Sequence, residues 1–455
     1  MPHPRDREIL RLAGPAFLAL VAEPLFLLAD AAIVGRLGTA PLAGLGIAAA
    51  VLQTAIGLCV FLAYGTTAQV ARRLGAADLR GAMTQGVDGL WLAVAIGTVV
   101  TILGVAFTDP LVATFGADAR VAEPAATYLR IAFLGTVPLL LMLAATGVLR
   151  GLQDTRTPLL VAVGGNALNI VANVVLVYGL GPIPALGIAG SAWGSVLAQV
   201  VSAAVLVGVV ARAARREGAS LLPDLAGVRA SGRAAVPLVV RTVTLRAALL
   251  VTTYAVAAGA GSPGTEALHL ATHQLALTLW TFLAFALDAI AIAAQALTGR
   301  TLGAGDASGT RALVRRMLRW GVVSGVVTGL LLAAGSPFLG SLFTPDADVQ
   351  SLLVPVLVVA ALGQPIAGLV FVLDGVLIGA GDGAYLARAG LLTLIVYAPL
   401  VLAAAALGAG LVAIWVLFVV IFMGSRLAVL RHRELRDDWL VTGAATYGAR
   451  PRAAG

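Results

Sequence analysis

The segment Leu74-Gly75-Ala76-Ala77-Asp78 recurs as Leu302-Gly303-Ala304-Gly305-Asp306, 228 residues further along the chain. A second pair of segments has the same spacing, since residues 147–154 (GVLRGLQD) match residues 375–382 (GVLIGAGD). Chance matches are common in Gly- and Ala-rich sequence, but two matches at one offset are not. The chain therefore contains an internal repeat of two similar halves.

Both halves are strongly apolar. Of the 455 residues, 60% are hydrophobic and 11% are charged, whereas soluble domains carry about 25% charged residues. So few charges cannot cover the surface of a soluble protein of this length. The apolar runs are long and continuous rather than alternating as in a barrel, so we predict an all-α polytopic membrane protein.

Hydropathy and helix breakers predict twelve membrane spans, six in each half. A helix of about 20 residues crosses a hydrocarbon core of roughly 30 Å. The predicted spans are residues 9–35, 43–70, 87–108, 125–149, 158–179, 188–211, 235–258, 266–298, 317–342, 349–378, 386–407 and 410–430.

The longest polar connection divides these spans into two lobes. We predict an amino-terminal lobe at residues 1–211, a cytoplasmic linker at 212–234 and a carboxy-terminal lobe at 235–430. Residues 431–455 are charged and then Ala- and Gly-rich, so they are predicted to form a disordered cytoplasmic tail. Six spans per half give both halves the same orientation, related by an axis along the membrane normal, as in many transporters.

The arginines predict the orientation of the spans. With a cytoplasmic amino terminus, the inner segments and the two termini hold 25 of the 30 basic residues, and only Arg36, Arg120 and Arg130 lie in outer segments. This asymmetry predicts a multi-pass protein of the inner (plasma) membrane with both termini in the cytoplasm. It also accounts for the net charge of +8, so no nucleic-acid partner is expected.

Two absences restrict the chemistry. The chain has no Lys, which excludes a phosphate-binding P-loop and a Schiff-base lysine. Its single cysteine, Cys59, excludes an internal disulfide and a cysteine-based metal cluster. We expect no enzyme activity, no catalytic residues and no cofactor. The expected partners are small organic substrates and membrane lipids, with the protein a monomer that has no obligatory protein partner.

Polar residues inside the spans of the first half predict a functional site. An ionisable residue at the centre of a bilayer costs about 2.5–3.5 kcal/mol on insertion scales, so it needs a reason to be there. Glu23 and Asp30 are seven residues apart and project from one face of the first span. Pro24 lies between them, removes a backbone hydrogen bond and is a predicted hinge.

Asn169 and Asn173 form an i, i+4 pair on the fifth span. Asp30 precedes Arg36 by six residues, and Asn173 precedes the end of its span by six. Both should therefore lie roughly 9 Å below the outer boundary, and Ser191 falls at a similar level. The expected site is a hydrogen-bonded cavity in which Asp30 exchanges a proton. The alternative is that Asp30 and Glu23 only tie helices together.

The second half has its own polar set. Its candidates for substrate binding are Arg246, Gln274, Asp288, Gln295 and Asp374. An Asp288–Arg246 ion pair is the alternative for two of them, and Asp374, near the inner end of its span, could simply be solvated. His269 and His273 have metal-ligand spacing, but without an evident third ligand they are predicted to be a helix-packing pair.

These segments resemble the multidrug and toxic compound extrusion (MATE) family, in particular its DinF-like branch. The resemblance covers all twelve spans and implies a MATE/MOP-type fold of two pseudo-symmetric six-helix lobes. It implies export of organic, often cationic and amphipathic, compounds in exchange for H⁺ or Na⁺ by alternating access. The segments that carry it are Glu23–Gly38, Asn166–Asn173, Leu287–Ala289, Ala294–Ala296 and Asp374–Asp382.

The resemblance also implies site residues. In the family, the acid of the first span and the fifth-span pair form a cation site, which carries over to Asp30, Asn169 and Asn173. Many relatives have Asp at the last position, so Asn173 leaves one carboxylate fewer for Na⁺ and favours H⁺. The carboxy-lobe acids of other branches do not match Asp288 or Asp374.

Three other functions stay open. Some DinF-like plant relatives export organic anions such as citrate, and Arg246 keeps that function possible. A lipid-precursor flippase of the same superfamily would normally have fourteen spans and a strongly basic cavity. A polytopic membrane enzyme should cluster acids or histidines at a membrane face, but the one adjacent Asp pair, Asp437-Asp438, lies in the polar tail.

Overall fold

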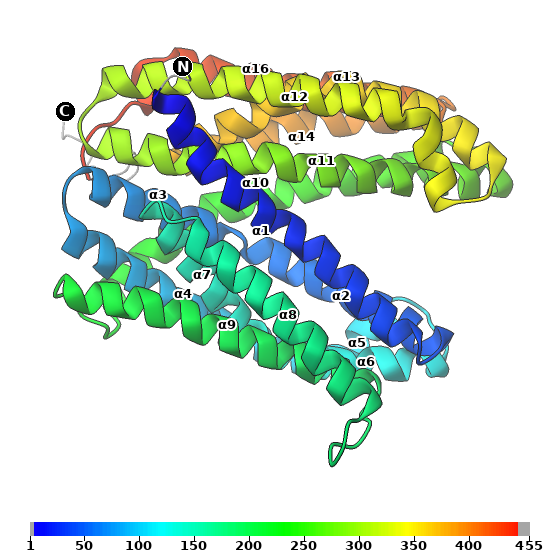
Figure 1. Ribbon diagram of the computed structural model, residues 1–455. Helices are drawn as coiled ribbons and strands as arrows, with labels where there is room; N and C mark the ends of the chain where they lie inside the picture. Colours follow the sequence, from blue (N-terminus) through cyan, green and yellow to red (C-terminus); the bar gives the residue numbers. More distant parts are fainter. Residues whose placement is uncertain (1–3, 445–455) are drawn as a thin grey trace. The chain divides into compact units, whose positions relative to one another are not determined.

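The computed structural model describes residues 4–444, apart from the side chains of Pro4, Glu23 and Pro263, and it is helical almost throughout (Figure 1). Within that range there is no strand, and the one β-bridge joins Leu180 and Ile183 in a loop. Eleven helical segments of the described chain are long and apolar enough to cross a membrane, and a bent helix pair brings the number to twelve. The predicted all-α polytopic membrane fold is confirmed.

The chain divides into two compact units. The amino-terminal unit is Gly14–Ala235, and the carboxy-terminal unit combines Met1–Ala13 with Val236–Gly455. The helices of the amino-terminal unit are α1 (Pro4–Gly35, from Gly14 onward), α2 (Thr39–Cys59), α3 (Phe61–Gly75), α4 (Leu79–Ala106), α5 (Thr108–Ala113), α6 (Ala119–Leu134), α7 (Thr136–Gly151), α8 (Arg156–Tyr178) and α9 (Ile188–Arg216).

The carboxy-terminal unit is also helical within the described residues. Its elements are α10 (Leu225–Ala258, from Val236 onward), α11 (Pro263–Gly303), α12 (Ala307–Phe343), α13 (Ala347–Gly379), α14 (Gly383–Ala406), α15 (Leu411–Leu417), the π-helix Phe418–Met423, α16 (Gly424–Leu435) and the 3₁₀ turn Asp437–Trp439.

Two of the predicted spans are not single straight helices. The span predicted at residues 43–70 is α2 followed by α3, which meet at Val60 and count together as one membrane-length segment, Thr39–Gly75. The span predicted at 125–149 is α6 followed by α7, which meet at Gly135 with a bend of 50°. Pro24 does not interrupt α1, which is one continuous helix.

The repeated segments form the same joint between helices four times. In each, one residue has a left-handed backbone and the next is an aspartate whose N–H bonds back to a carbonyl five residues earlier, as in a Schellman cap. The left-handed residues are Ala77, Gln153, Gly305 and Gly381, with φ of 57°, 65°, 81° and 76°. The sequence repeat therefore encodes a structural joint.

At two of the four joints, the aspartate is the N-cap residue of the next helix and its side chain accepts a backbone hydrogen bond there. Asp78 accepts from the Gly81 N–H at 2.8 Å, and Asp306 accepts from the Gly309 N–H at 2.7 Å. The Gly309 and Ser308 hydrogen bonds hold the pKa of Asp306 below its ordinary value of 3.8. The stabilisation is therefore present above that value and is lost as the pH falls through the lower folded pKa.

The joints predict opposite effects of exchanging Ala and Gly. A non-glycine residue with a left-handed backbone costs about 1–2 kcal/mol, so Ala77→Gly should stabilise the protein by up to about 1 kcal/mol after the entropy cost of glycine. Gly305→Ala should destabilise it by about 1 kcal/mol. The thermal unfolding midpoint of the purified protein measures both. Ala76→Gly, where φ is −77°, is the control and should lower the midpoint. Equal lowering by Ala77→Gly would contradict this account.

Two segments differ from the prediction. Because α9 continues to Arg216 and α10 begins at Leu225, only residues 217–224 of the predicted linker 212–234 are non-helical. The predicted disordered tail from Arg431 instead stays helical to Leu435, and Trp439 is 1% exposed. Composition could not reveal the partners that order this segment, such as the carboxylate of Asp382, which pairs with Arg433. Residues 445–455 of the tail lie outside the described residues.

Candidate functional site

Four helices of the amino-terminal unit bring a buried polar cluster together. Asp30 lies one turn before the end of α1, Asn169 and Asn173 lie on one face of α8, and Ser191 lies in the first turn of α9. Tyr128 joins them from α6. All five residues are buried, and Asp30 is 3% exposed. Four of the five residues predicted for the amino-terminal site, Asp30, Asn169, Asn173 and Ser191, therefore lie in one cluster.

Asp30 accepts hydrogen bonds from three neutral side chains. The Asn173 Nδ2 donates to Asp30 Oδ1 at 2.8 Å, and the Ser191 hydroxyl donates to the same oxygen at 2.5 Å. The Tyr128 hydroxyl donates to Asp30 Oδ2 at 3.3 Å. No ion pair includes Asp30 within the described residues. A negative charge on Asp30 would therefore be stabilised by these hydrogen bonds alone, at a residue that is almost fully buried.

The hydrogen bonds continue along α8 and α9. The Asn173 Nδ2 also donates to Asn169 Oδ1 at 3.0 Å, and the Asn169 Nδ2 donates to Ser195 Oγ at 3.0 Å. The Asn173 Oδ1 is buried and has no hydrogen-bond partner among the described residues. This oxygen can still accept a donor or coordinate a cation.

Two more hydrogen bonds hold α8 against α1 on either side of Asp30. The Asn166 Nδ2 donates to the Ala22 carbonyl at 3.1 Å, and the Tyr178 hydroxyl donates to the Ile33 carbonyl at 2.7 Å. The backbone of α1 is therefore hydrogen-bonded to α8 both before and after Asp30. Glu23 belongs to α1, but its side chain lies outside the described residues.

Close packing of α9 on α8 holds Asn173 in place, and Gly194 allows it. A methyl group on Gly194 would lie 2.0 Å from Asn173 Oδ1 and 3.0 Å from its backbone nitrogen. Helices approach this closely in membranes where the interface residue is small. Figure 1 shows α8 and α9 running side by side.

We expect Gly194→Ala to destabilise the protein by about 1–3 kcal/mol, the usual cost of overpacking. The added methyl must push α9 from α8 or turn the Asn173 amide away from Asp30. The thermal unfolding midpoint measures the effect. Gly208→Ala on the same helix is the matched control, because a methyl group there meets no atom within 4 Å. Equal midpoints for the two variants would show that α8 and α9 are not in close contact at Gly194.

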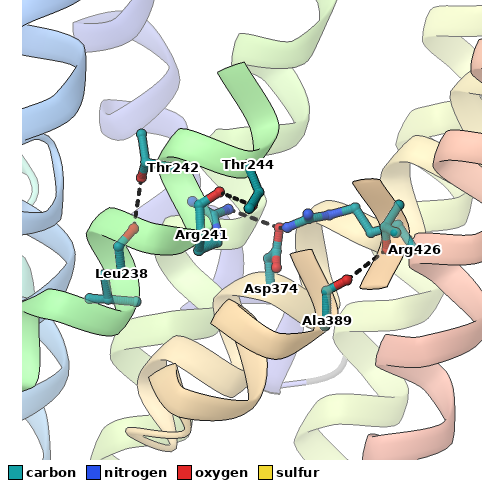
Figure 2. A network of polar contacts seen from close by, with 8 residues as sticks. Leu238, Arg241, Thr242, Thr244, Asp374, Ala389 and Arg426 are labelled. Carbon is teal, nitrogen blue, oxygen red and sulfur yellow. Dashed lines mark hydrogen bonds and ion pairs between the residues drawn. The ribbon is translucent and has the colours of Figure 1, made fainter. Parts of the chain in front are cut away.

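The carboxy-terminal unit neutralises its buried acid differently. Asp374, on α13, is 6% exposed. Figure 2 shows it between Arg241 of α10 and Arg426 of α16, with the guanidinium nitrogens 2.8 and 2.5 Å from Asp374 Oδ2. The expectation that Asp374 could be solvated is wrong, because two arginines from other helices cover it.

The remaining carboxy-terminal candidates do not form one site. Gln274 is exposed and Gln295 is buried. They are 21 residues apart on α11, roughly 30 Å along a helix axis. Asp288 is half-buried between them, and Arg246 is exposed on α10. Sequence reasoning chose Arg246, but Arg241 is the α10 residue that reaches the buried acid.

His269 and His273 lie in different environments. His269 is half-buried, and its Nδ1 has no hydrogen-bond partner among the described residues. His273 is 2% exposed and its ring bonds on both sides, since the Trp415 Nε1 donates to Nδ1 at 3.2 Å and the Thr253 hydroxyl lies 3.1 Å from Nε2. Across the described chain, no group of three or more His, Cys, Asp or Glu residues could hold a metal ion. His273 is therefore a packing residue.

The sequence is similar to known membrane proteins over most of its length. The family model described as MatE matches residues 15–175 and 248–403. Protein DETOXIFICATION 44, chloroplastic, of Arabidopsis thaliana is 33% identical over 393 residues, which cover 82% of this chain and 72% of that protein. DNA damage-inducible protein F of Escherichia coli (strain K12) is 29% identical over 379 residues, 82% of this chain and 81% of that protein.

Solved structures show the same fold. One described as the outward-facing conformation of a multidrug resistance MATE family transporter of the MOP superfamily superposes with a TM-score of 0.86. The match covers 96% of this chain and 97% of that one at 22% sequence identity. At that identity the match shows the fold alone.

Proposed function

This chain belongs to the MATE family of transporters, and we propose that it is a secondary active exporter that exchanges amphipathic organic compounds for protons bound at Asp30. One observation carries the proposal: Asp30 is a buried carboxyl held only by neutral donors. A charge in such a place is costly. Uptake of a proton or a cation removes the cost.

Protonation would rearrange the cluster. The ionised carboxylate accepts all three of its hydrogen bonds, whereas a protonated carboxyl has one oxygen that donates. The donor facing that oxygen must then turn or leave, and the Asn173 Oδ1, which has no partner among the described residues, is an acceptor within the same cluster. We propose that this exchange of hydrogen bonds shifts α1 against α8, aided by Pro24, and releases the substrate.

The driving force follows from the exchanged charges. A proton moving down a potential of 100 mV supplies about 2.3 kcal/mol, and each pH unit supplies about 1.4 kcal/mol. Exchange of one proton for one monovalent cation moves no net charge, so the pH gradient alone would drive it. We place both termini in the cytoplasm and the protein in the plasma membrane, on the basis of the arginine distribution.

Sodium coupling is the second candidate, and the Asn173 Oδ1 favours it. If the Asn173 amide turned over, its Oδ1 would join the oxygens of Asp30 and Asn169, which now accept from its Nδ2, as ligands of the kind that hard cations prefer. The site has a single carboxylate, which is one fewer than many relatives have, so the proton remains the preferred ion. An organic-anion exporter and a lipid-precursor flippase are the substrate alternatives.

Transport by the purified protein in proteoliposomes tests both couplings. A cationic dye should leave the vesicles in response to an imposed pH gradient, in the absence of Na⁺, and an equal Na⁺ gradient at constant pH should have no effect. Efflux driven only by a Na⁺ gradient would show that the coupling ion is Na⁺ and not H⁺. The same vesicles loaded with citrate or with a labelled lipid test the other substrates, and no gradient-driven movement of any of them would refute export.

A further inference from the structure

One face of α12 carries a row of three arginines. Arg311, Arg315 and Arg319 follow one another at four-residue intervals in the first turns of the helix, and each of them is exposed. Residues four apart are neighbours on a helix surface and lie about 6 Å apart along its axis. This arginine row therefore presents three guanidinium groups on one side of the helix.

The same face of α12 continues as an apolar surface. Val323, Val326 and Leu330 are exposed and lie within about 40° of Arg319 around the helix axis. The candidate membrane span Ala307–Phe343 has 37 residues, or about 55 Å of helix, whereas a hydrocarbon core is roughly 30 Å thick. The apolar surface suits lipid tails, and the arginine row lies at the end of the helix that reaches the headgroup layer.

The arginine row is specific to the second half of the chain. The positions 228 residues earlier, at the offset of the repeated joints, are Met83, Val87 and Trp91 on α4. Met83 and Val87 are buried. The architecture shared by the two halves therefore does not require arginines at these places, and their presence on α12 needs another reason.

The helix itself supplies no anion to balance the arginine row. Between Ala307 and Phe343 there is no Asp or Glu, and the fourth arginine, Arg316, is bonded to Asp6, which accepts from its Nε at 2.6 Å. Like charges one turn apart repel each other, and the amino-terminal end of a helix favours negative charge. Arg319 makes no ion pair or hydrogen bond among the described residues. An anion from outside the helix would therefore stabilise the row.

The segment that ends α16 shows that the arginine row attracts acidic groups. Asp437 forms an ion pair with Arg311, and Glu434 lies close enough to Arg315 for their charges to attract. The side chains of Arg311 and Asp437 are 47% and 73% exposed, and exposed ion pairs contribute little to stability. A phosphate in the headgroup layer can therefore displace the carboxylate of Asp437.

Other contacts hold this segment in place without Asp437. The Arg433 guanidinium donates to the buried carboxylate of Asp382 at 2.7 Å. Trp439 is 1% exposed, and the Gly443 N–H donates to the Leu302 carbonyl at 2.9 Å. Removal of the Asp437 charge should therefore leave the segment docked and change only the charge beside the arginine row.

We propose that the arginine row binds the phosphate of an anionic phospholipid and that Asp437 is a built-in competitor for this site. Arginine suits the role because its planar guanidinium donates two parallel hydrogen bonds to phosphate oxygens. In the proposed orientation the row lies at the cytoplasmic leaflet, whose anionic lipids attract basic segments. The site requires neither a transported substrate nor a coupling ion, so it does not rest on the proposed export.

Native mass spectrometry of the detergent-purified protein, titrated with dioleoylphosphatidylglycerol, tests the site. Arg319→Gln should weaken binding of the first lipid by about fivefold, and Arg315→Gln with Arg319→Gln by about 25-fold, because each arginine adds a similar attraction. Arg388→Gln is the matched control, because it removes one exposed arginine from α14 of the same unit. It should leave the affinity unchanged. Equal affinities of the double variant and the wild type would refute the site.

Asp437→Asn should act in the opposite direction. Loss of the competing carboxylate should tighten phosphatidylglycerol binding by about two- to fivefold, which a misfolded variant would not show. A gain that is absent would refute the competition between Asp437 and the lipid.

Two further ligands separate the phospholipid from its parts. Dioleoylphosphatidylcholine has the same tails and no net charge, and inorganic phosphate has no tails, so each should bind the wild type at least about tenfold more weakly than phosphatidylglycerol. Equal binding of phosphatidylcholine would show that only the apolar surface binds. Equal binding of inorganic phosphate would make the arginine row a site for a free anion. Either result would overturn the proposal.

Discussion

Asp30→Asn should abolish gradient-driven export and leave substrate binding intact. The side-chain carbonyl of asparagine can still accept the bonds that Asn173 and Ser191 now donate to the carboxylate. The residue cannot, however, take up or release a proton at any accessible pH. The cluster should therefore keep its shape and lose its response to pH, with efflux falling by about a hundredfold or more if proton exchange is its only driver.

The measurement is dye efflux from proteoliposomes under an imposed pH gradient, with binding of the same dye to the detergent-solubilised protein measured beside it. Glu123→Gln is the matched control, because it removes an exposed carboxyl from α6 of the same unit. It should change neither quantity. If Asp30→Asn still responds to the pH gradient as the wild type does, Asp30 is only a structural residue and the proposed coupling is wrong.

Much of this cluster could be predicted from the sequence because a membrane helix fixes both the height and the face of each residue. Spacing from the span ends placed Asp30, Asn173 and Ser191 at one level, and the i, i+4 spacing placed Asn169 on the face of Asn173. In the structure these four side chains are hydrogen-bonded in one cluster. Their role in coupling stays a prediction.

Sequence reasoning missed two residues of the cluster around Asp30, Ser195 and Tyr128. Only the first of them could have been found from the sequence. Ser195 lies four residues after Ser191, so the same helical rule would have included it. Tyr128 carried no such signal. It lies on α6, and the bend of 50° between α6 and α7 was not predicted from the sequence, so neither was the direction of α6. Only the packing of α6 on its neighbours brings that hydroxyl to Asp30.

The partners of Asp374 in the carboxy-terminal unit were harder to predict from the sequence, because the buried face of a helix must be known first. Arg241 and Arg246 are five residues apart on α10 and so project about 140° apart around the helix. Choosing between them requires knowing which face of α10 is buried, and the composition of that helix does not decide it. Arg426 was counted among the inner charges that orient the last span, although it is 3% exposed and bonded to Asp374.

Asp374→Asn should destabilise the carboxy-terminal unit far more than removal of either of its partners. Asp374 is one carboxylate between two guanidinium groups, so its loss removes the anion from the buried guanidinium of Arg426 and leaves that charge facing the half-buried guanidinium of Arg241. Removing the partner of a buried charge typically costs about 3–5 kcal/mol. Arg241→Gln instead leaves the Asp374–Arg426 pair intact and neutral, so it should cost about 1.5–3 kcal/mol, the value of a hydrogen bond to a charged group.

Thermal unfolding of the purified protein, followed by tryptophan fluorescence, separates these cases. The midpoints should fall in the order wild type, Arg241→Gln, Asp374→Asn. Adding Arg426→Gln to Asp374→Asn removes one of the two like charges that would face each other and should therefore raise the midpoint above that of Asp374→Asn alone, even though it deletes a further side-chain contact. A stabilising second deletion of this kind has no explanation in packing, whereas repulsion between two neighbouring guanidinium groups requires it. If the double variant is instead less stable than Asp374→Asn, the three residues act through shape and hydrogen bonds, and charge balance is not what holds α10, α13 and α16 together.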